Sequence, residues 1–166
     1  MSDVRVGIGY DIHRFAAGRK LVLGGVVLAH KKGLTGHSDA DVVLHAVADA
    51  LLGAVARGDI GQHFPDTDPR FKGAASLELL RRVAGIVKKA GYGVGNVDVM
   101  LLLEAPRIAA YRGRMRNNIA RVLGIPESRV SVKATTHEGV GAIGRNEAAA
   151  AYAVVAVHEN GRTKRA

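Results

Sequence analysis

Asp11 and His13 are the first side chains along the chain that could carry out chemistry. They lie one residue apart in the segment GIGYDIHRF, residues 7–15. The β-branched content and the alternation of residues 4–13 predict a strand, and side chains two positions apart in a strand project to the same face. The pattern fits two metal ligands or a base with its orienting partner. It fits equally two solvated polar groups at the end of a strand.

His45 is a third polar group, and it lies among apolar residues at helical spacing in the segment 39–58. Asp41 and Asp49 lie one turn before and one turn after it, so three polar groups share one stripe. A single histidine on such a helix is usually a core residue with a hydrogen-bond partner. Together with Asp11 and His13, however, it could complete a set of two histidines and one aspartate, which suits Zn²⁺ with a fourth, open position.

Two further segments carry polar groups that suit phosphates and sugars. The loop FPDTDP, residues 64–69, concentrates acids and a threonine among prolines, which fits a hydroxyl-binding loop or an ordinary surface turn. In KATTHEGVGAIGR, residues 133–145, Thr135 and Thr136 suit phosphate oxygens, and Glu138 is an oxygen ligand suited to Mg²⁺. The glycines match neither the dinucleotide nor the Walker spacing. His37 precedes the helix, where backbone N–H groups favour anions.

The elements that must position these groups follow from periodicity and from turn residues. Strands are predicted at 4–13, 96–106, 129–136 and 148–159, a hairpin at 20–30, and helices at 39–58, 76–93 and 107–125. The alanines of the last strand could equally continue a helix. Ser38 or Asp39 is the expected N-cap of the first helix and Gly58 its C-cap, whereas Ser76 is the expected cap of the second helix. Residues 59–76 are expected to form a loop. Three helices on one face of a mixed sheet of about four to five strands make a single α/β (α+β) domain.

Composition narrows the class of protein. The chain has 166 residues and no cysteine, so it fits one domain, and any transition metal must use His, Asp and Glu. Its net charge of +9 would suit nucleic acid, but only 4% of its residues are aromatic. Little material is therefore available for stacking bases, which favours an anionic metabolite. Because no signal peptide or long apolar run is present, we expect a cytoplasmic protein that binds neither membrane nor nucleic acid.

Taken together, four segments closely resemble the 2-C-methyl-D-erythritol 2,4-cyclodiphosphate synthase family of non-mevalonate isoprenoid biosynthesis. They are GYDIHRF, the long block from Gly36 to Ser76, GNVDVMLLLEAPR and KATTHEGVGAIGR, in the family's order and spacing from about Val4 to Val157. The resemblance implies a domain over residues 1–158, followed by a basic tail at 159–166. It also implies a homotrimer with the sheets inside and the active sites between neighbouring subunits.

The activity implied by the resemblance is that of a cyclising phosphorus–oxygen lyase. Its substrate is 4-diphosphocytidyl-2-C-methyl-D-erythritol 2-phosphate, a cytidine diphosphate-linked molecule, and its second product is CMP. Asp11, His13 and His45 would bind Zn²⁺, Glu138 would hold a second divalent ion (Mg²⁺ or Mn²⁺), and His37 and Thr136 would stabilise the transition state. The implied substrate contacts are Asp11, Ile12, His13, His37, Ser38, Asp59, Ile60, Gly61, Phe64, Pro65, Asp66, Thr67, Asp68, Leu103, Glu104, Ala105, Pro106, Arg107, Ile108, Ala109, Thr135, Thr136, His137, Glu138, Ala142 and Arg145.

Some positions depart from the family's usual pattern, and two other functions compete. His137 stands where a third threonine is common, Ala142 replaces an aromatic residue, and Arg107 replaces a lysine with a change of geometry. A metal-dependent phosphohydrolase could use the same Asp-His-His set with water as nucleophile. A basic nucleic-acid-binding module would show steep salt dependence without metal dependence.

Overall fold

The computed structural model describes residues 3–160. In chain order its elements are β1 (Val4–Ala17), β2 (Leu21–Leu23), β3 (Val26–Leu28), β4 (Lys32–Leu34), α1 (Val42–Ala54), α2 (Ile60–His63), α3 (Ser76–Lys89), β5 (Tyr92–Leu102), α4 (Arg112–Leu123), β6 (Val130–Thr135), α5 (Gly141–Gly144) and β7 (Ala148–Glu159). Short 3₁₀ turns lie at Pro69–Phe71 and Glu127–Arg129. Of the expected basic tail, residues 161–166 lie outside the described residues.

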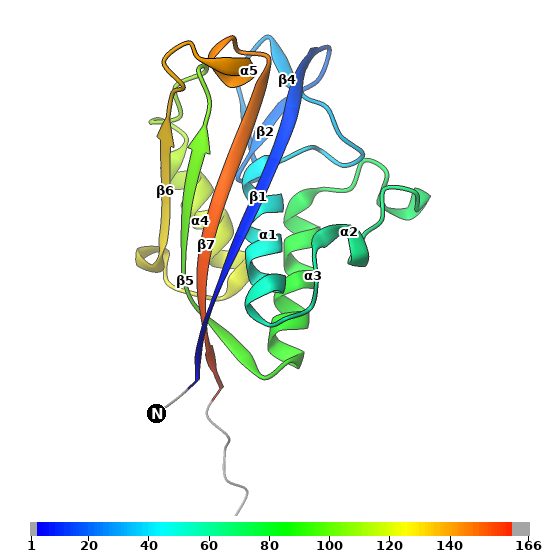
Figure 1. Ribbon diagram of the computed structural model, residues 1–166, viewed down its shortest axis with the longest axis vertical. Coiled ribbons are helices and arrows are strands. Elements are labelled where there is room, and N and C mark those ends of the chain that lie inside the picture. Colours follow the sequence, from blue (N-terminus) through cyan, green and yellow to red (C-terminus); the bar gives the residue numbers. More distant parts are fainter. Residues whose placement is uncertain (1–2, 161–166) are drawn as a thin grey trace, which may run out of the picture.

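Five strands form one mixed sheet, as the sequence predicts, and their order in it is β4-β1-β7-β5-β6 (Figure 1). The pair β5–β6 is parallel and the other neighbours are antiparallel. Strands β2 and β3 form the predicted hairpin as a separate two-stranded sheet. Strand β1 is longer than expected, because its last residues leave β7 and pair with β4.

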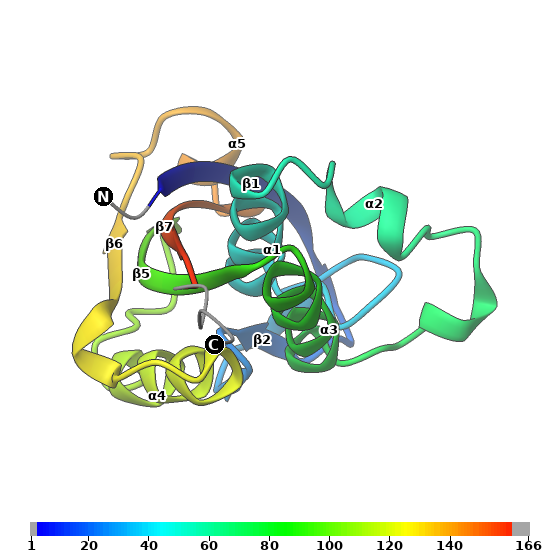
Figure 2. The same cartoon turned by 90° about the horizontal axis from the view of Figure 1, so that it is seen from below.

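Helices α1, α3 and α4 cover one face of the large sheet, and Figure 2 shows the two layers end-on. Helix α1 packs against β1 and β7, while α3 packs against α1 and α4. The core lies between these layers, where Leu44, Leu51, Leu80 and Met115 are fully buried. Among the described residues, no helix combines the length and the apolar character that crossing a membrane requires.

Helix α1 lies unusually close to β1 because the strand presents glycine to it. A Cβ atom on Gly9 would lie 2.0 Å from the carbonyl oxygen of Ala46, and one on Gly7 would lie 1.9 Å from that of Ala50. Neither separation is possible for a real side chain, so the contact here is between two backbones. Asp11 and His13 continue the same face of β1, which places them next to α1.

The other face of β1 and β7 carries an apolar surface that the chain itself does not cover. It consists of Val4, Val6, Ile8, Tyr10 and Ile12 from β1 with Tyr152 and Val154 from β7, and Ile8 is 68% exposed. The rings of Tyr10 and Tyr152 lie side by side, with their centroids 4.7 Å apart. Contiguous apolar surface on the face of a sheet is typical of a protein–protein interface.

Several predicted helix boundaries were wrong. Helix α1 is capped by Asp41 rather than by Ser38 or Asp39, and it ends at Ala54, well before Gly58. The N-cap of α3 is Ala75, which makes no side-chain cap hydrogen bond. The expected loop at 59–76 contains α2 and a 3₁₀ turn. The final segment, by contrast, is a strand, as predicted. Helix α4 begins at Arg112 rather than at residue 107, and its C-cap is Gly124 in the left-handed conformation.

Candidate metal centre and substrate cavities

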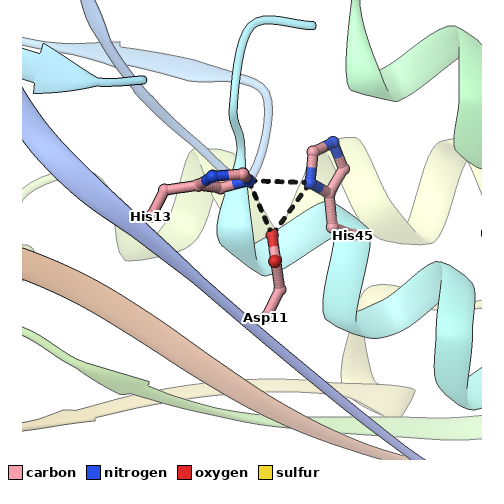
Figure 3. Close-up of side chains that lie close together, drawn as sticks. All are labelled: Asp11, His13 and His45. Carbon is pink, nitrogen blue, oxygen red and sulfur yellow. Dashed lines mark hydrogen bonds and ion pairs between the residues drawn. The ribbon is translucent and has the colours of Figure 1, made fainter. Parts of the chain in front are cut away.

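Asp11, His13 and His45 converge on one point, as Figure 3 shows. Asp11 Oδ2 lies 2.8 Å from His45 Nδ1 and 3.0 Å from His13 Nε2, and the two histidine nitrogens are 3.4 Å apart. Two ligands come from β1 and the third from α1. The predicted same-face pair on the strand and the predicted helical histidine therefore do meet.

The geometry of these three atoms fits a tetrahedral metal ion. Bonds of about 2.0–2.1 Å place neighbouring ligand atoms of a tetrahedron about 3.3 Å apart, and the observed triangle has edges of 2.8–3.4 Å. One carboxylate and two imidazoles are a donor set that zinc accepts, with a fourth position left for a substrate oxygen. The triad therefore fits a divalent metal.

The carboxylate of Asp11 and the two imidazoles of the triad shift one another's charge states. Burial alone would raise the pKa of Asp11, but hydrogen bonds from His13 and His45 outweigh it and hold this pKa well below its usual range. Burial likewise opposes the charged form of His45, yet the hydrogen bond to Asp11 and the nearby carboxylates raise its pKa. Asp11 thus stays an anion across the physiological range, which is the state in which a carboxylate binds a metal.

The two other acids on the stripe around His45 have structural roles. Asp41 is fully buried, and its carboxylate accepts backbone N–H bonds from Gly24, Gly25, Val43 and Leu44 at 2.7–3.2 Å. It therefore joins the β2–β3 turn to the start of α1. Asp49 accepts the backbone N–H of Ile60 at 2.7 Å and so holds the start of α2 against α1. Neither residue joins the metal triad.

A cavity of about 480 Å³ opens beside the triad. Asp11, His13 and His45 form one wall, with His37 and Ser38 next to them. Of the other predicted substrate contacts, Ile60, Gly61, Phe64, Pro65 and Asp66 line the same cavity, as do Phe71 and Leu79, which sequence reasoning missed. The Nε2 atom of His37 lies 3.3 Å from the carbonyl oxygen of Asp68, so the ring holds the 64–68 loop near the triad.

A second cavity, of about 220 Å³, lies at the ends of β5 and β6. It shares no lining residue with the first cavity, and in the sheet β7 separates β5 from β1. Eight predicted substrate contacts line it: Leu103, Glu104, Pro106, Arg107, Ile108, Ala109, Thr135 and Thr136. The single chain therefore divides the predicted substrate contacts into two groups. We call those that line the first cavity the metal half and those that line the second cavity the second half.

The remaining predicted contacts line neither of these cavities. The side chain of Ile12 belongs to the exposed apolar face, because it alternates with Asp11 and His13. Asp59 and Asp68 cap the short helices that follow them, and Arg145 pairs with Glu147. The others are Ala105, Thr67, His137, Glu138 and Ala142. Thr136 donates its hydroxyl proton to Glu138 at 2.8 Å, and Glu104 accepts the backbone N–H of His137 at 2.7 Å.

A family model supplies the observation that decides what kind of protein this is. The model described as the YgbB family matches residues 4–158, nearly the whole chain. The chain belongs to the YgbB family.

Curated relatives of this YgbB-family chain agree with the resemblance expected from its motifs. It is 57% identical over 159 residues to 2-C-methyl-D-erythritol 2,4-cyclodiphosphate synthase of Syntrophobacter fumaroxidans, with 96% of this chain and 100% of the relative covered.

The synthase of the same name from Chlorobaculum tepidum is 60% identical over 151 residues, covering 91% of this chain and 96% of the relative.

Solved structures extend the likeness of the YgbB-family chain to three dimensions. The bifunctional IspDF from Campylobacter jejuni matches with a TM-score of 0.92 at 40% identity, over 96% of this chain and 43% of that one. IspF from Plasmodium falciparum, solved as a CDP complex, matches with a TM-score of 0.84 at 34% identity, over 96% and 99% of the two chains.

Proposed function

We propose that the protein converts 4-diphosphocytidyl-2-C-methyl-D-erythritol 2-phosphate into 2-C-methyl-D-erythritol 2,4-cyclodiphosphate and CMP, in the cytoplasm. An oxygen of the 2-phosphate bonds to the β-phosphorus. The bond from that phosphorus to the bridging oxygen breaks, and CMP leaves with this oxygen. The observation that carries the proposal is the convergence of Asp11, His13 and His45 beside a cavity, in a chain whose relatives bear the name of this synthase.

The chain's own residues would divide the work as follows. Asp11 Oδ2, His13 Nε2 and His45 Nδ1 would hold Zn²⁺, and Glu138 would hold Mg²⁺ or Mn²⁺. Bound divalent ions neutralise the repulsion between the two phosphates and polarise the electrophilic phosphorus. The protein then needs no nucleophile of its own, and its task is to hold the reacting groups in line.

His37 and Thr136 are the residues we assign to stabilising the transition state. The ring of His37 lines the metal cavity and reaches the loop that would hold the methylerythritol portion. Thr136 lies in the second cavity, where its hydroxyl proton is directed at Glu138. If Glu138 held a cation, Thr136 could donate this proton to a phosphate oxygen instead, because a carboxylate that ligates a metal is a weaker acceptor.

We further propose that the protein is a homotrimer with the sheets inside, and that each active site lies between two subunits. Two observations support this assembly. The apolar surface centred on Ile8 and Tyr10 is uncovered in the single chain and needs a partner. The predicted substrate contacts also fall into two separate cavities, so a neighbouring subunit is required to bring the second half to the metal half.

The decisive experiment is phosphorus NMR of the purified protein with the cytidyl substrate and a divalent metal. We expect a cyclic diphosphate and CMP. A linear product would show hydrolysis by water and would overturn the proposal in favour of a phosphohydrolase.

The variant His45→Ala should abolish CMP release while the protein remains folded, and removing divalent metal from the wild type should do the same. His30→Ala is the matched control, because His30 is a half-buried histidine after the hairpin that lines neither cavity. Full activity of His45→Ala, or of metal-free protein, would contradict the mechanism.

A further inference from the structure

The far side of the His45 ring meets two buried hydroxyl groups. His45 Nδ1 faces Asp11 and His13, whereas Nε2 lies 3.0 Å from Ser76 Oγ and 3.1 Å from Ser38 Oγ. Ser76 is 1% exposed and lies at the start of α3, far from His45 in the sequence. The ring nitrogen that does not face the triad is therefore held by groups from outside its own helix.

The proton of the Ser76 hydroxyl is directed away from His45. Ser76 Oγ donates a hydrogen bond to Asp39 Oδ1, and the backbone N–H of Ser76 donates to Asp39 Oδ2 at 3.0 Å. A hydroxyl carries one proton, and an ionised carboxylate only accepts. Because that proton goes to Asp39, the oxygen of Ser76 faces His45 Nε2 as an acceptor.

We propose that Asp39 and Ser76 are positioning residues, which hold the proton of His45 on Nε2 and leave the Nδ1 lone pair directed at the metal position. Neutral imidazole has one protonated and one bare nitrogen, and the partner of the first decides which atom the second is. Ser38 Oγ is a second acceptor for the same N–H, while it also accepts the backbone N–H of Ala40 at 3.1 Å. This inference rests on the metal site of the proposed function.

Helix capping alone does not account for the arrangement. Asp39 Oδ2 supplies a cap to α3 through the backbone N–H of Ser76, in the place of Ala75, which makes no side-chain cap bond. That bond does not need the Ser76 hydroxyl. The hydroxyl instead continues the chain from Asp39 to His45, so Ser76→Ala removes the link to the ring and leaves the cap in place.

Asp39→Asn tests the direction of this chain. The amide has one oxygen and one NH₂ group, and the oxygen is required by the backbone N–H of Ser76. The NH₂ group then donates to Ser76 Oγ, whose own proton turns toward His45 Nε2. That reversal favours the proton on Nδ1, where it competes with the metal. Loss of such outer partners typically weakens metal binding about 10–100-fold.

The experiment measures zinc dissociation constants by competition with a chromophoric chelator, together with thermal melting of each metal-free protein. Asp39→Asn should bind zinc about 10–100-fold more weakly, and Ser76→Ala about tenfold more weakly because Ser38 remains as an acceptor. Ser76→Thr, which keeps the hydroxyl, should bind more tightly than Ser76→Ala. The matched controls Asp98→Asn and Ser131→Ala alter an aspartate and a serine that lie opposite each other on β5 and β6, where Asp98 pairs with Lys133, and both should bind zinc like the wild type.

A second measurement needs no variant. A ¹H–¹⁵N NMR correlation of the zinc-loaded wild type should show a protonated Nε2 and an unprotonated Nδ1 on His45. Wild-type zinc affinity in both Asp39→Asn and Ser76→Ala would overturn the inference, and so would a proton on Nδ1 in the loaded wild type. In either case the proposed function would stand, whereas a wild type that binds no zinc would overturn both.

Discussion

Substituting Gly9 by alanine should weaken metal binding although Gly9 binds no metal. The new Cβ would lie 2.0 Å from the carbonyl oxygen of Ala46 and 2.7 Å from the backbone nitrogen of Ala50. Both are backbone atoms and cannot rotate away, so α1 and β1 must separate by about 1 Å to reach normal contact distance. His45 precedes Ala46 on α1, and it must therefore move away from the two ligands on β1.

The size of the effect follows from the geometry of the triad. Metal–ligand distances tolerate about 0.2 Å, so a shift of about 1 Å is several times too large. We expect zinc binding to weaken about 100-fold, by analogy with the roughly 100-fold loss of rate that a 1 Å misplacement can cause in catalysis. Overpacking should also lower the free energy of unfolding by about 1–3 kcal/mol. In a chain of this length, that lowers the melting temperature by about 2–12 °C.

Calorimetric zinc titration of the folded variant, with thermal melting followed by circular dichroism, checks both effects. Gly53→Ala is the matched control, because it lies on the same helix and its new Cβ would meet nothing closer than the carbonyl oxygen of Ile8 at 3.9 Å. Alanine should raise the stability there by about 0.5–1 kcal/mol and leave zinc binding unchanged. If Gly9→Ala binds zinc and melts like the wild type, the backbone contact does not set the position of His45.

Three other outcomes are expected. Asp41→Asn should lower the free energy of unfolding by about 1–3 kcal/mol in denaturant titrations, because its NH₂ group cannot accept the N–H of Gly25; unchanged stability would contradict the role given to Asp41. Ile8→Asp should yield a monomer of 17.4 kDa in light scattering, whereas the wild type should have three times that mass; a trimeric variant would show that the exposed face is not the interface. The zinc-induced rise in melting temperature should grow with pH above about 6.5, the ordinary pKa of histidine. The pKa of His45 is raised, so its stabilising ion pair with Asp11 is complete at lower pH and is lost as pH rises through that pKa. Over the same range, protons compete less with zinc for the ring. A zinc-induced rise that shrinks with increasing pH would contradict this coupling.

The parts of the site that depend on local periodicity could be predicted from the sequence. The two-residue repeat of a strand placed Asp11 and His13 on one face, and helical spacing placed His45 on a helix. That the three would meet came from the resemblance to a family. No local pattern shows that the glycines before Asp11 lie directly against a helix, because Gly7 and Gly9 fit an ordinary strand equally well.

The incorrect N-cap predictions share one physical cause, which is competition between tertiary partners. Ser38, Asp39 and Asp41 are all good N-cap residues, and the sequence does not choose among them. Asp41 becomes the cap because its carboxylate also binds the turn between β2 and β3. Asp39 is then free to reach Ser76 on another helix, and Ser76 turns its hydroxyl to this acid and to His45.

The division of the substrate contacts between two cavities has a consequence for mixtures of subunits. If each site joins the metal half of one subunit to the second half of a neighbour, a substitution in one half damages only the sites to which that half contributes. A subunit carrying His45→Ala and a subunit damaged at Arg107 are each inactive when pure. A mixed assembly contains a site built from the undamaged half of each subunit. The two inactive proteins should therefore regain activity when they are unfolded, mixed and refolded together.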